Sequence, residues 1–405
     1  MTVHYFIGRT GTGKTETMHD DIIRQSKEDP AGKPIILLVP DQMTFISEQK
    51  LIKKHTVGLQ RAQVYSFPRL ARRILQEQGG LTHTFLQKQG MHVLLRKVME
   101  EHKSDFKLFT KSSDTPGFIE NMDTMLKEFQ RYNVEPGHIN DIKEKAEQKT
   151  VQTANDKILS DKLSDILLLW EKMEAEMEGR FIGLEDYLPM LRDKIPHSNM
   201  LDGCRIYLDG FHSFTPQEME ILLMLVNKAE QTTIALTMDK AHIQQDTHAL
   251  DLFKETADTF HLLQQMSADK EQHVRLFEAE EDKEGRHEDL RHLEANFEKR
   301  PIHVRNHSPN VQMWSPANKR VEVDHTARTI LEKVKENGYR FKDIAVMARS
   351  ISDYDDLLQT SFRDHGIPLF TDQTKKWSII LYWSFYGRYW SGLRRAGAMK
   401  RYSGL

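Results

Sequence analysis

The sequence predicts an α/β fold built on a parallel sheet. Three observations predict it: the apolar run of residues 3–7 leads into a glycine-rich segment, a second apolar run of residues 34–40 is bounded by prolines, and a helix-compatible stretch lies between them. A continuous apolar run of this kind is typical of a strand buried on both faces. Residues 64–67 are a third, shorter strand pattern, so the order of strands and helices predicts the beginning of a RecA-like domain.

The glycine-rich segment matches GxxxxGK[ST], the pattern of a phosphate loop that binds a nucleoside triphosphate. Glycines let the backbone turn its N–H groups toward phosphate oxygens, and the helix that follows adds a favourable dipole. We expect Lys14 to reach the β- and γ-phosphates of ATP and Thr15 to hold Mg²⁺. The alternative is a glycine-rich turn that only joins a strand to a helix. The segment comprises Gly8, Arg9, Thr10, Gly11, Thr12, Gly13, Lys14 and Thr15.

Such a magnesium site also needs a carboxylate at the end of another strand. Residues 205–209 are an apolar strand pattern that ends in Asp209, the candidate carboxylate. In an efficient ATPase of the helicase type a glutamate follows this aspartate and activates water, whereas here the next residue is Gly210. We therefore expect a site that binds ATP yet hydrolyses it poorly, and we assign no catalytic residue. Alternatively, Asp209 caps a strand-to-loop turn.

Patterns along the chain predict several segments. Long helical patterns without a convincing strand between them predict a helical insertion, a densely charged stretch predicts a solvated helix or connector, and a buried-strand pattern at residues 343–349 predicts the start of a second RecA-like domain. The expected segments are 1–83 with 197–277 for the first RecA-like domain, 84–196 for the insertion, 278–300 for the connector and 301–375 for the start of the second RecA-like domain.

Composition limits the class of protein. The 405 residues are 39% apolar and 29% charged with a formal net charge of −3, so any DNA contact must be a local patch. The single cysteine, Cys204, excludes an internal disulfide and a Cys-rich metal site and fits a reducing cytosol. With no signal peptide and no run long enough to span a bilayer, we expect a cytoplasmic protein that does not act at a membrane.

A basic segment is the candidate for DNA contact. Residues 49–76 contain seven lysines or arginines and no acidic residue, with two aromatic residues between them. Cations that meet phosphates and rings that stack on bases are typical of single-stranded DNA binding. The alternative is a basic helix face with two core aromatic residues. The candidate DNA-binding residues are Lys53, Lys54, Tyr65, Phe67, Arg69, Arg72 and Arg73.

Four segments in this order resemble one family. With the phosphate loop they are residues 38–45 (LVPDQMTF), 64–70 (VYSFPRL) and 207–217 (YLDGFHSFTPQ). Residues 1 to about 375 resemble the AddB family, the second subunits of the bacterial AddAB helicase–nucleases. The DGF sequence in place of the DE-containing motif of an active helicase makes this resemblance specific.

The resemblance implies a fold and a function. The family is related to superfamily 1 helicases, and with an AddA-type motor as its heterodimer partner it processes double-stranded DNA ends for recombination, as an ATP-dependent exonuclease. Its members bind ATP and scan single-stranded DNA for the Chi hotspot without motor activity, and their C-terminal nuclease domain holds a [4Fe–4S] cluster. No adenine-reading glutamine motif precedes Gly8, and residues 234–240 stand where a helicase has its GDxxQ sensor. From the resemblance we therefore assign only two roles: nucleotide binding and help in holding Mg²⁺. Nucleotide binding is assigned to Gly8, Gly11, Gly13, Lys14 and Thr15, and help in holding Mg²⁺ to Asp209.

The end of the chain departs from this family. Its members are much longer, so we expect the nuclease carboxylates and the cluster cysteines beyond residue 405, and a chain that cannot itself cut DNA. Residues 373–405 contain no Asp or Glu, where the average of 60 in 405 predicts about five, and they hold three of the five tryptophans. This composition indicates a shifted reading frame over residues 376–405. The alternative is a cationic, aromatic segment at a membrane surface.

Two other functions fit the opening motif. A phosphate-loop kinase for a small metabolite would need a catalytic base and an arginine-rich lid, and the helical insertion argues against it. A non-enzymatic ATP-dependent switch would bind a partner protein without salt-dependent affinity for single-stranded DNA.

Overall fold

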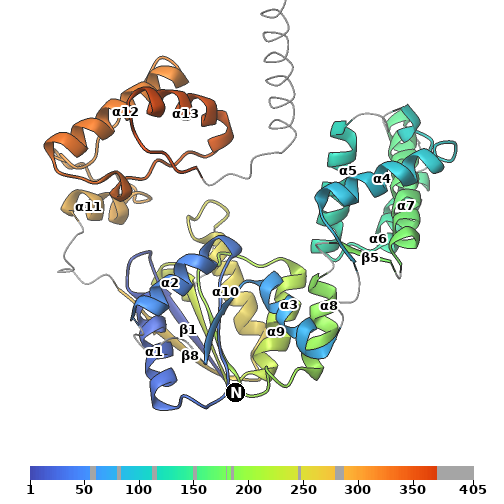
Figure 1. Cartoon of the computed structure of the whole chain (residues 1–405), viewed down its shortest axis with the longest axis horizontal. Coiled ribbons are helices and arrows are strands. Elements are labelled where there is room, and N and C mark those ends of the chain that lie inside the picture. Colours follow the sequence, from blue (N-terminus) through green and yellow to red (C-terminus); the bar gives the residue numbers. More distant parts are fainter. Residues whose placement is uncertain are drawn as a thin grey trace, which may run out of the picture. The chain divides into compact units, whose positions relative to one another are not determined.

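The structure, a computed structural model, divides into two compact units, Met1–Gly285 and Arg286–Leu405, which are described separately (Figure 1). It describes residues 1–54, 61–79, 84–111, 116–148, 153–178, 180–183, 187–244, 248–278 and 287–371. The expected out-of-frame tail, residues 376–405, lies outside these ranges.

A six-stranded parallel sheet is the centre of the first unit, which confirms the predicted α/β fold (Figure 1). The strand order is β3-β2-β6-β7-β1-β8, and every pair of neighbours is parallel. All six carboxyl ends therefore meet at one edge of the sheet, where ligands bind in open α/β sheets. The strands are β1 (Thr2–Gly8), β2 (Ile35–Leu38), β3 (Ala62–Tyr65), β6 (Arg205–Leu208), β7 (Gln231–Thr237) and β8 (Glu271–Leu276).

Helices pack on both faces of this sheet (Figure 1). On one face, Met18 and Leu51 pack with Leu37 and Tyr207. The opposite face buries side chains such as Phe260 against the other side of β1. The first face carries α1 (Lys14–Glu28) and α2 (Thr44–Lys54), and the second carries α3 (Phe67–Gln78), α8 (Tyr187–Lys194), α9 (Pro216–Lys228) and α10 (Lys254–Met266).

A second core lies among four helices within the segment predicted as an insertion. In that core Trp170 stacks on Phe129 at 5.7 Å between ring centroids. The buried Asp165 carboxylate accepts hydrogen bonds from the backbone N–H groups of residues 107–109 at 2.7–2.9 Å, which holds the turn after α4 against α7. The helices are α4 (Lys88–Glu101), α5 (Pro116–Arg131), α6 (Pro136–Glu147) and α7 (Ala154–Met177).

Three strands differ from the prediction. The parallel pair β4 (Thr84–Leu86) and β5 (Phe181–Gly183) lies in a region predicted to have no convincing strand, because three residues are too few to show a periodic pattern. The strand β8 was also missed. Its exposed side chains are mostly polar, as expected of an edge strand rather than of a buried one.

The second unit contains helices without a strand among its described residues. The predicted strand at residues 343–349 is wrong: Asp343 ends a 3-10 helix, residues 344–349 form no strand, and Met347 is 92% exposed. A strand needs a neighbour with which to exchange main-chain hydrogen bonds, and residues 287–371 provide none. The helices are α11 (Glu288–Asn296), α12 (Lys319–Glu336) and α13 (Asp355–Asp364), and α12 packs on α13.

Short 3-10 helices join several of these elements. They are η1 (Asp41–Met43), η2 (Phe109–Lys111), η3 (Ile195–His197), η4 (Lys240–Ile243), η5 (Phe341–Asp343) and η6 (Ile351–Asp353). Within the described part of the chain, no helix is both long enough and apolar enough to cross a lipid bilayer.

The buried thiol of Cys204 gives a test of this core. Burial raises the pKa of Cys204 to about 12, so at pH 8 only about one thiol in ten thousand is ionised. We expect the folded chain to resist a disulfide reagent at pH 8 and one thiol per chain to react at once in urea. Rapid labelling of the native chain would contradict the burial of Cys204 beneath the sheet.

Candidate nucleotide and nucleic-acid site

The phosphate-loop segment links the end of β1 to the start of α1 at the carboxyl edge of the sheet. Gly11 and Gly13 have φ values of 78° and 92°, in the left-handed region that favours glycine. Gly8 is required for a different reason: a Cβ atom there would lie 2.2 Å from the carbonyl oxygen of Phe277. Each of the three glycines in this loop, the two of the pattern and Gly11, therefore has a structural cause.

Lys14 lies inside the loop and is 7% exposed. Its Nζ donates hydrogen bonds to the carbonyl oxygens of Gly8 at 2.6 Å and Arg9 at 2.9 Å. Thr12 Oγ1 also donates to the Arg9 carbonyl, at 2.9 Å. Burial lowers the pKa of Lys14, and the nearby Asp209 carboxylate opposes this shift. The loop therefore holds a desolvated lysine, the kind of group that a phosphate would stabilise.

Thr15 and Asp209, the two residues expected to hold Mg²⁺, lie in contact. Thr15 Oγ1 donates a hydrogen bond of 2.7 Å to Asp209 Oδ2, although 194 positions separate the two residues. A hydroxyl and a carboxylate oxygen are ligands suited to Mg²⁺, which completes its shell with waters and phosphates. The described residues contain no group of three His, Cys, Asp or Glu side chains able to hold a metal ion.

Gly210 adopts a left-handed conformation, with a φ of 80°. A Cβ atom at this position would lie 2.5 Å from Met43 Sδ. A glutamate would thus need an unfavourable backbone conformation as well as displacement of the methionine side chain. The backbone of this turn therefore disfavours any residue with a side chain at the position where a water-activating glutamate was considered.

Two features of the site were not predicted. The guanidinium of Arg9 forms a two-point ion pair with Asp239, with both N–O distances at 2.5 Å, and lies 5.5 Å from the ring centroid of Phe253. His19 on α1 is 1% exposed, and among the described residues neither of its ring nitrogens has a hydrogen-bond partner; burial lowers the pKa of His19. The signal for Asp239 was present, because it follows a strand just as Asp209 does.

The candidate DNA-binding residues do not form one continuous track. Lys53 and Lys54 lie on α2, whereas Arg69, Arg72 and Arg73 lie on α3, which packs on the other face of the sheet. Lys54 pairs with Glu16 and, at 2.9 Å, with Asp20, so its charge is already compensated.

Phe67 is in the core, as the alternative interpretation held. It is 3% exposed and packs edge-on against Phe211 and Phe214, with centroid distances of 5.8 and 6.4 Å. Its ring is therefore not available to stack on a base. Tyr65 is half-buried and its hydroxyl donates to Gln63; burial raises the pKa of Tyr65, against the effect of Arg73.

Besides the paired Lys54, three cations of the predicted set are exposed, namely Lys53, Arg69 and Arg72. Over the described ranges, none of the three forms an ion pair. Arg69 and Arg72 lie in the first two turns of α3, which follows the carboxyl end of β3. Of the predicted set, Arg69 and Arg72 are therefore the residues that lie beside the carboxyl edge of the sheet. Within the described ranges, neither has an acidic partner for its charge.

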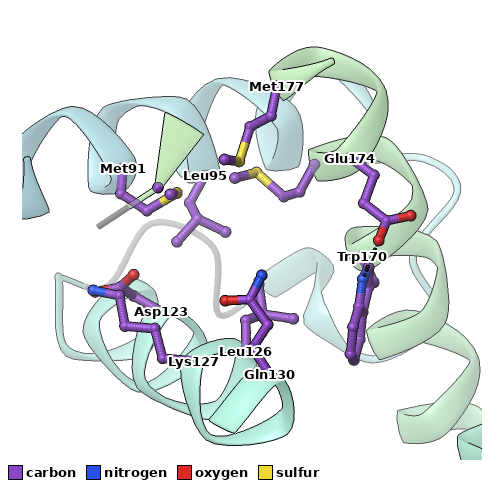
Figure 2. A pocket seen from close by; sticks show the side chains of 11 residues that line it. Met91, Leu95, Asp123, Leu126, Lys127, Gln130, Trp170, Glu174 and Met177 are labelled. Carbon is purple, nitrogen blue, oxygen red and sulfur yellow. Dashed lines mark hydrogen bonds and ion pairs between the residues drawn. The ribbon is translucent and has the colours of Figure 1, made fainter. Parts of the chain in front are cut away.

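A separate hollow lies among the helices of the second core (Figure 2). Methionine and leucine side chains line it, together with Trp170. Its polar groups are already paired: Asp123 with His92 at 3.1 Å and with Lys127 at 2.9 Å, and Trp170 Nε1 with Glu174 at 2.8 Å. This hollow is explained as part of the helical core.

The fold and site together define a parallel α/β protein with a phosphate-loop sequence next to a strand-end aspartate. The family model described as "ADDB, N-terminal" matches residues 5–294. The chain is 41% identical over 378 residues to the B-type subunit of the ATP-dependent helicase/deoxyribonuclease of Bacillus subtilis (strain 168), and 39% identical over 375 residues to the protein of the same name from Anoxybacillus flavithermus (strain DSM 21510 / WK1). The chain therefore belongs to the AddB family.

These alignments also measure how much of each protein is shared. Each covers 92% of this chain and 32% of the relative. The chain thus spans about a third of the length of the curated relatives that it matches.

The buried ammonium of Lys14 predicts a pH-dependent stability. The folded-state pKa of Lys14 is below its ordinary value of 10.5, so burying the charged form opposes folding at pH 7, and this penalty disappears as pH rises through the folded pKa toward 10.5. We expect Lys14→Met without nucleotide to melt above the wild-type temperature at pH 7, and this difference to shrink as pH rises toward 10.5. Lys27→Met, at an exposed lysine of the same helix, is the control. A large loss of stability at pH 7 in Lys14→Met would contradict this account.

Proposed function

We propose that this chain is the nucleotide- and DNA-binding part of an ATP-dependent helicase–deoxyribonuclease subunit, which works in the cytoplasm with an AddA-type subunit on double-stranded DNA ends during recombination. The observation that carries the proposal is the contact between Thr15 and Asp209 at the carboxyl edge of the sheet, in a chain of the AddB family. On this proposal, residues 1–83 and 197–277 are one RecA-like domain. The assignment of residues 301–375 to a second one rests on the resemblance, since its expected strand is absent.

ATP is the proposed nucleotide of this site. The loop glycines leave room for phosphates, and Lys14 would exchange the carbonyl oxygens of Gly8 and Arg9 for phosphate oxygens. Thr15 and Asp209 would hold Mg²⁺, which neutralises phosphate charge when bound. Both residues supply oxygen ligands within one hydrogen-bond length of each other, so the site fits this ion.

ATP binding in this chain is proposed to serve DNA scanning rather than movement. The position after Asp209 lacks a base, and the local backbone disfavours any residue but glycine there. Slow hydrolysis suits a protein that keeps its nucleotide while a motor partner translocates. A non-enzymatic ATP switch is the second candidate, favoured by the same glycine, and DNA binding distinguishes the two.

Single-stranded DNA is proposed to cross the carboxyl edge of the sheet beside α3. Arg69 and Arg72 would meet phosphates, with Arg73 and Tyr65 next to them. Phe67 has no stacking role in this proposal because it is buried. Scanning for Chi remains an assignment by family, and no residue here is given a Chi-reading role.

Nuclease activity is not assigned to residues of this chain. A [4Fe–4S] cluster needs four thiolates, and the sequence has one cysteine, which is buried under the sheet. The residues present therefore do not fit the cluster, and we derive no step through it.

Nucleotide binding and turnover form the first test. We expect MgATP to raise the melting temperature of the wild-type chain and Lys14→Ala to abolish that effect, while Lys27→Ala retains it. Turnover by the wild type should lie at least about a hundredfold below that of an ordinary ATPase, because general base catalysis alone contributes roughly 10²–10⁴-fold. Fast hydrolysis by the wild type would overturn the proposed scanning role.

Salt dependence of single-stranded DNA binding is the second test. Removing two phosphate contacts with the double substitution Arg69→Ala and Arg72→Ala should lower the slope of log K against log salt by about 1.4, since each contact to a single strand contributes about 0.7. Arg192→Ala, on α8 and paired with acidic neighbours, is the matched control. An unchanged slope in the double variant would remove α3 from the DNA site. No binding at all by the wild type would favour the switch.

A further inference from the structure

A groove lies between α1 and the edge strand β8, on the face of the sheet that α1 partly covers. Phe6 of β1 and Thr233 of β7 line its floor, Thr17 and Asp20 line the helix side, and Arg275 lines the β8 side. Thr17 is in the first turn of α1, directly after the phosphate loop. Only this residue borders the phosphate-loop end of the helix. The rest of the lining lies farther along α1 and toward the amino ends of the strands, and comprises His4, Asp21, Arg24, Gln25, Arg205 and Gln231.

Arg275, on the β8 side of this groove, forms an aromatic and cationic platform with Phe6 and with Phe277, which lies just beyond the residues that line the groove. The guanidinium of Arg275 lies 4.7 Å from the ring centroid of Phe277 and 5.7 Å from that of Phe6, and the two ring centroids are 4.9 Å apart. Arg275 is exposed, and over the described ranges of the chain it forms no ion pair with a carboxylate. Its charge is therefore held by aromatic faces alone, which leaves it able to stack on a further flat group.

The platform is fixed to the phosphate loop by the backbone. Phe277 N donates a hydrogen bond of 2.7 Å to the carbonyl oxygen of Ile7, and the Phe277 carbonyl lies so close to Gly8 that no Cβ fits there. In the sheet, β8 lies on one side of β1, whereas β7 and then β6 lie on its other side. Asp209 and the platform thus lie on opposite sides of the loop.

We infer that Arg275 of β8 and Phe277, just after this strand, bind the base and ribose end of the nucleotide, here a purine nucleoside triphosphate. This inference rests on the proposed nucleotide site. If Mg²⁺ and the terminal phosphates lie toward Asp209, the rest of the nucleotide leaves the loop on the other side, where the groove begins at Thr17. Aromatic rings and guanidinium planes stack on bases with little dependence on sequence.

The same inference answers a question raised by the sequence. No adenine-reading glutamine motif precedes Gly8, so contacts to the base must come from another part of the chain. On this inference the contacts to the base come from β8, which begins more than 260 positions after Gly8. The residue after this strand, Phe277, is hydrogen-bonded to Ile7, next to the loop. Recognition by stacking predicts affinity for the base without strong selection of one purine over another.

The test compares MgATP with inorganic tripolyphosphate, which has the phosphates and lacks the base. We expect Phe277→Leu and Arg275→Gln each to weaken MgATP about tenfold, the effect of losing one stacked contact, and to leave tripolyphosphate unchanged. Lys14→Ala should weaken both ligands. Val274→Ala is the matched control, because alternation along β8 points this residue to the opposite face of the sheet.

The outcomes separate the two proposals. If the wild type binds neither ligand, the proposed nucleotide site itself fails. If the wild type binds MgATP and both platform variants bind it equally well, the platform has no role in binding and the inference is overturned. Equal loss of both ligands in these variants would also overturn it, since β8 would then only support the loop. If Phe277→Leu does not fold, the exposed Arg275→Gln decides the result.

Discussion

The position of β1 between β7 and β8 is the constraint on which the site depends. Parallel pairing brings the carboxyl ends of these strands to one edge, so a loop at the start of the sequence meets Asp239 and Phe277 from the far end of the first unit. A slip of one residue in β1 would turn Tyr5 and Ile7 from the core that contains Phe260 to the α1 face, and Phe6 from the α1 face to the core that contains Phe260. The buried side chains of this strand therefore fix the geometry of the phosphate loop.

Function and stability oppose each other in this loop. Lys14 and Asp209 are both 7% exposed, and each depends on a few short hydrogen bonds to compensate for lost hydration. The loop also uses left-handed glycines that lose more conformational freedom on folding than other residues. Such features are typical of a site that is completed by its ligand rather than one that only stabilises the fold.

The sequence predicted what local chemistry determines. The strands β1, β2 and β6 follow from their apolar runs, and the position of Asp209 follows from the rule that such a strand ends at the carboxyl edge. The exposed edge strand β8 was missed because its pattern is half polar, and residues 343–349 were predicted as a strand because an apolar run does not reveal whether a partner strand exists. The burial of Phe67 depends on Phe211 and Phe214, which come from a distant part of the chain.

The order of strands also affects how the chain can fold as it is synthesised. β1 is made first, but both of its neighbours in the sheet come more than 200 residues later. At about 5–20 residues per second, the ribosome takes roughly 10–50 s to deliver them. During that time the apolar residues of β1 have no strand beside them. The nascent chain therefore carries β1 with its apolar side chains uncovered by strands until β7 and β8 have been made.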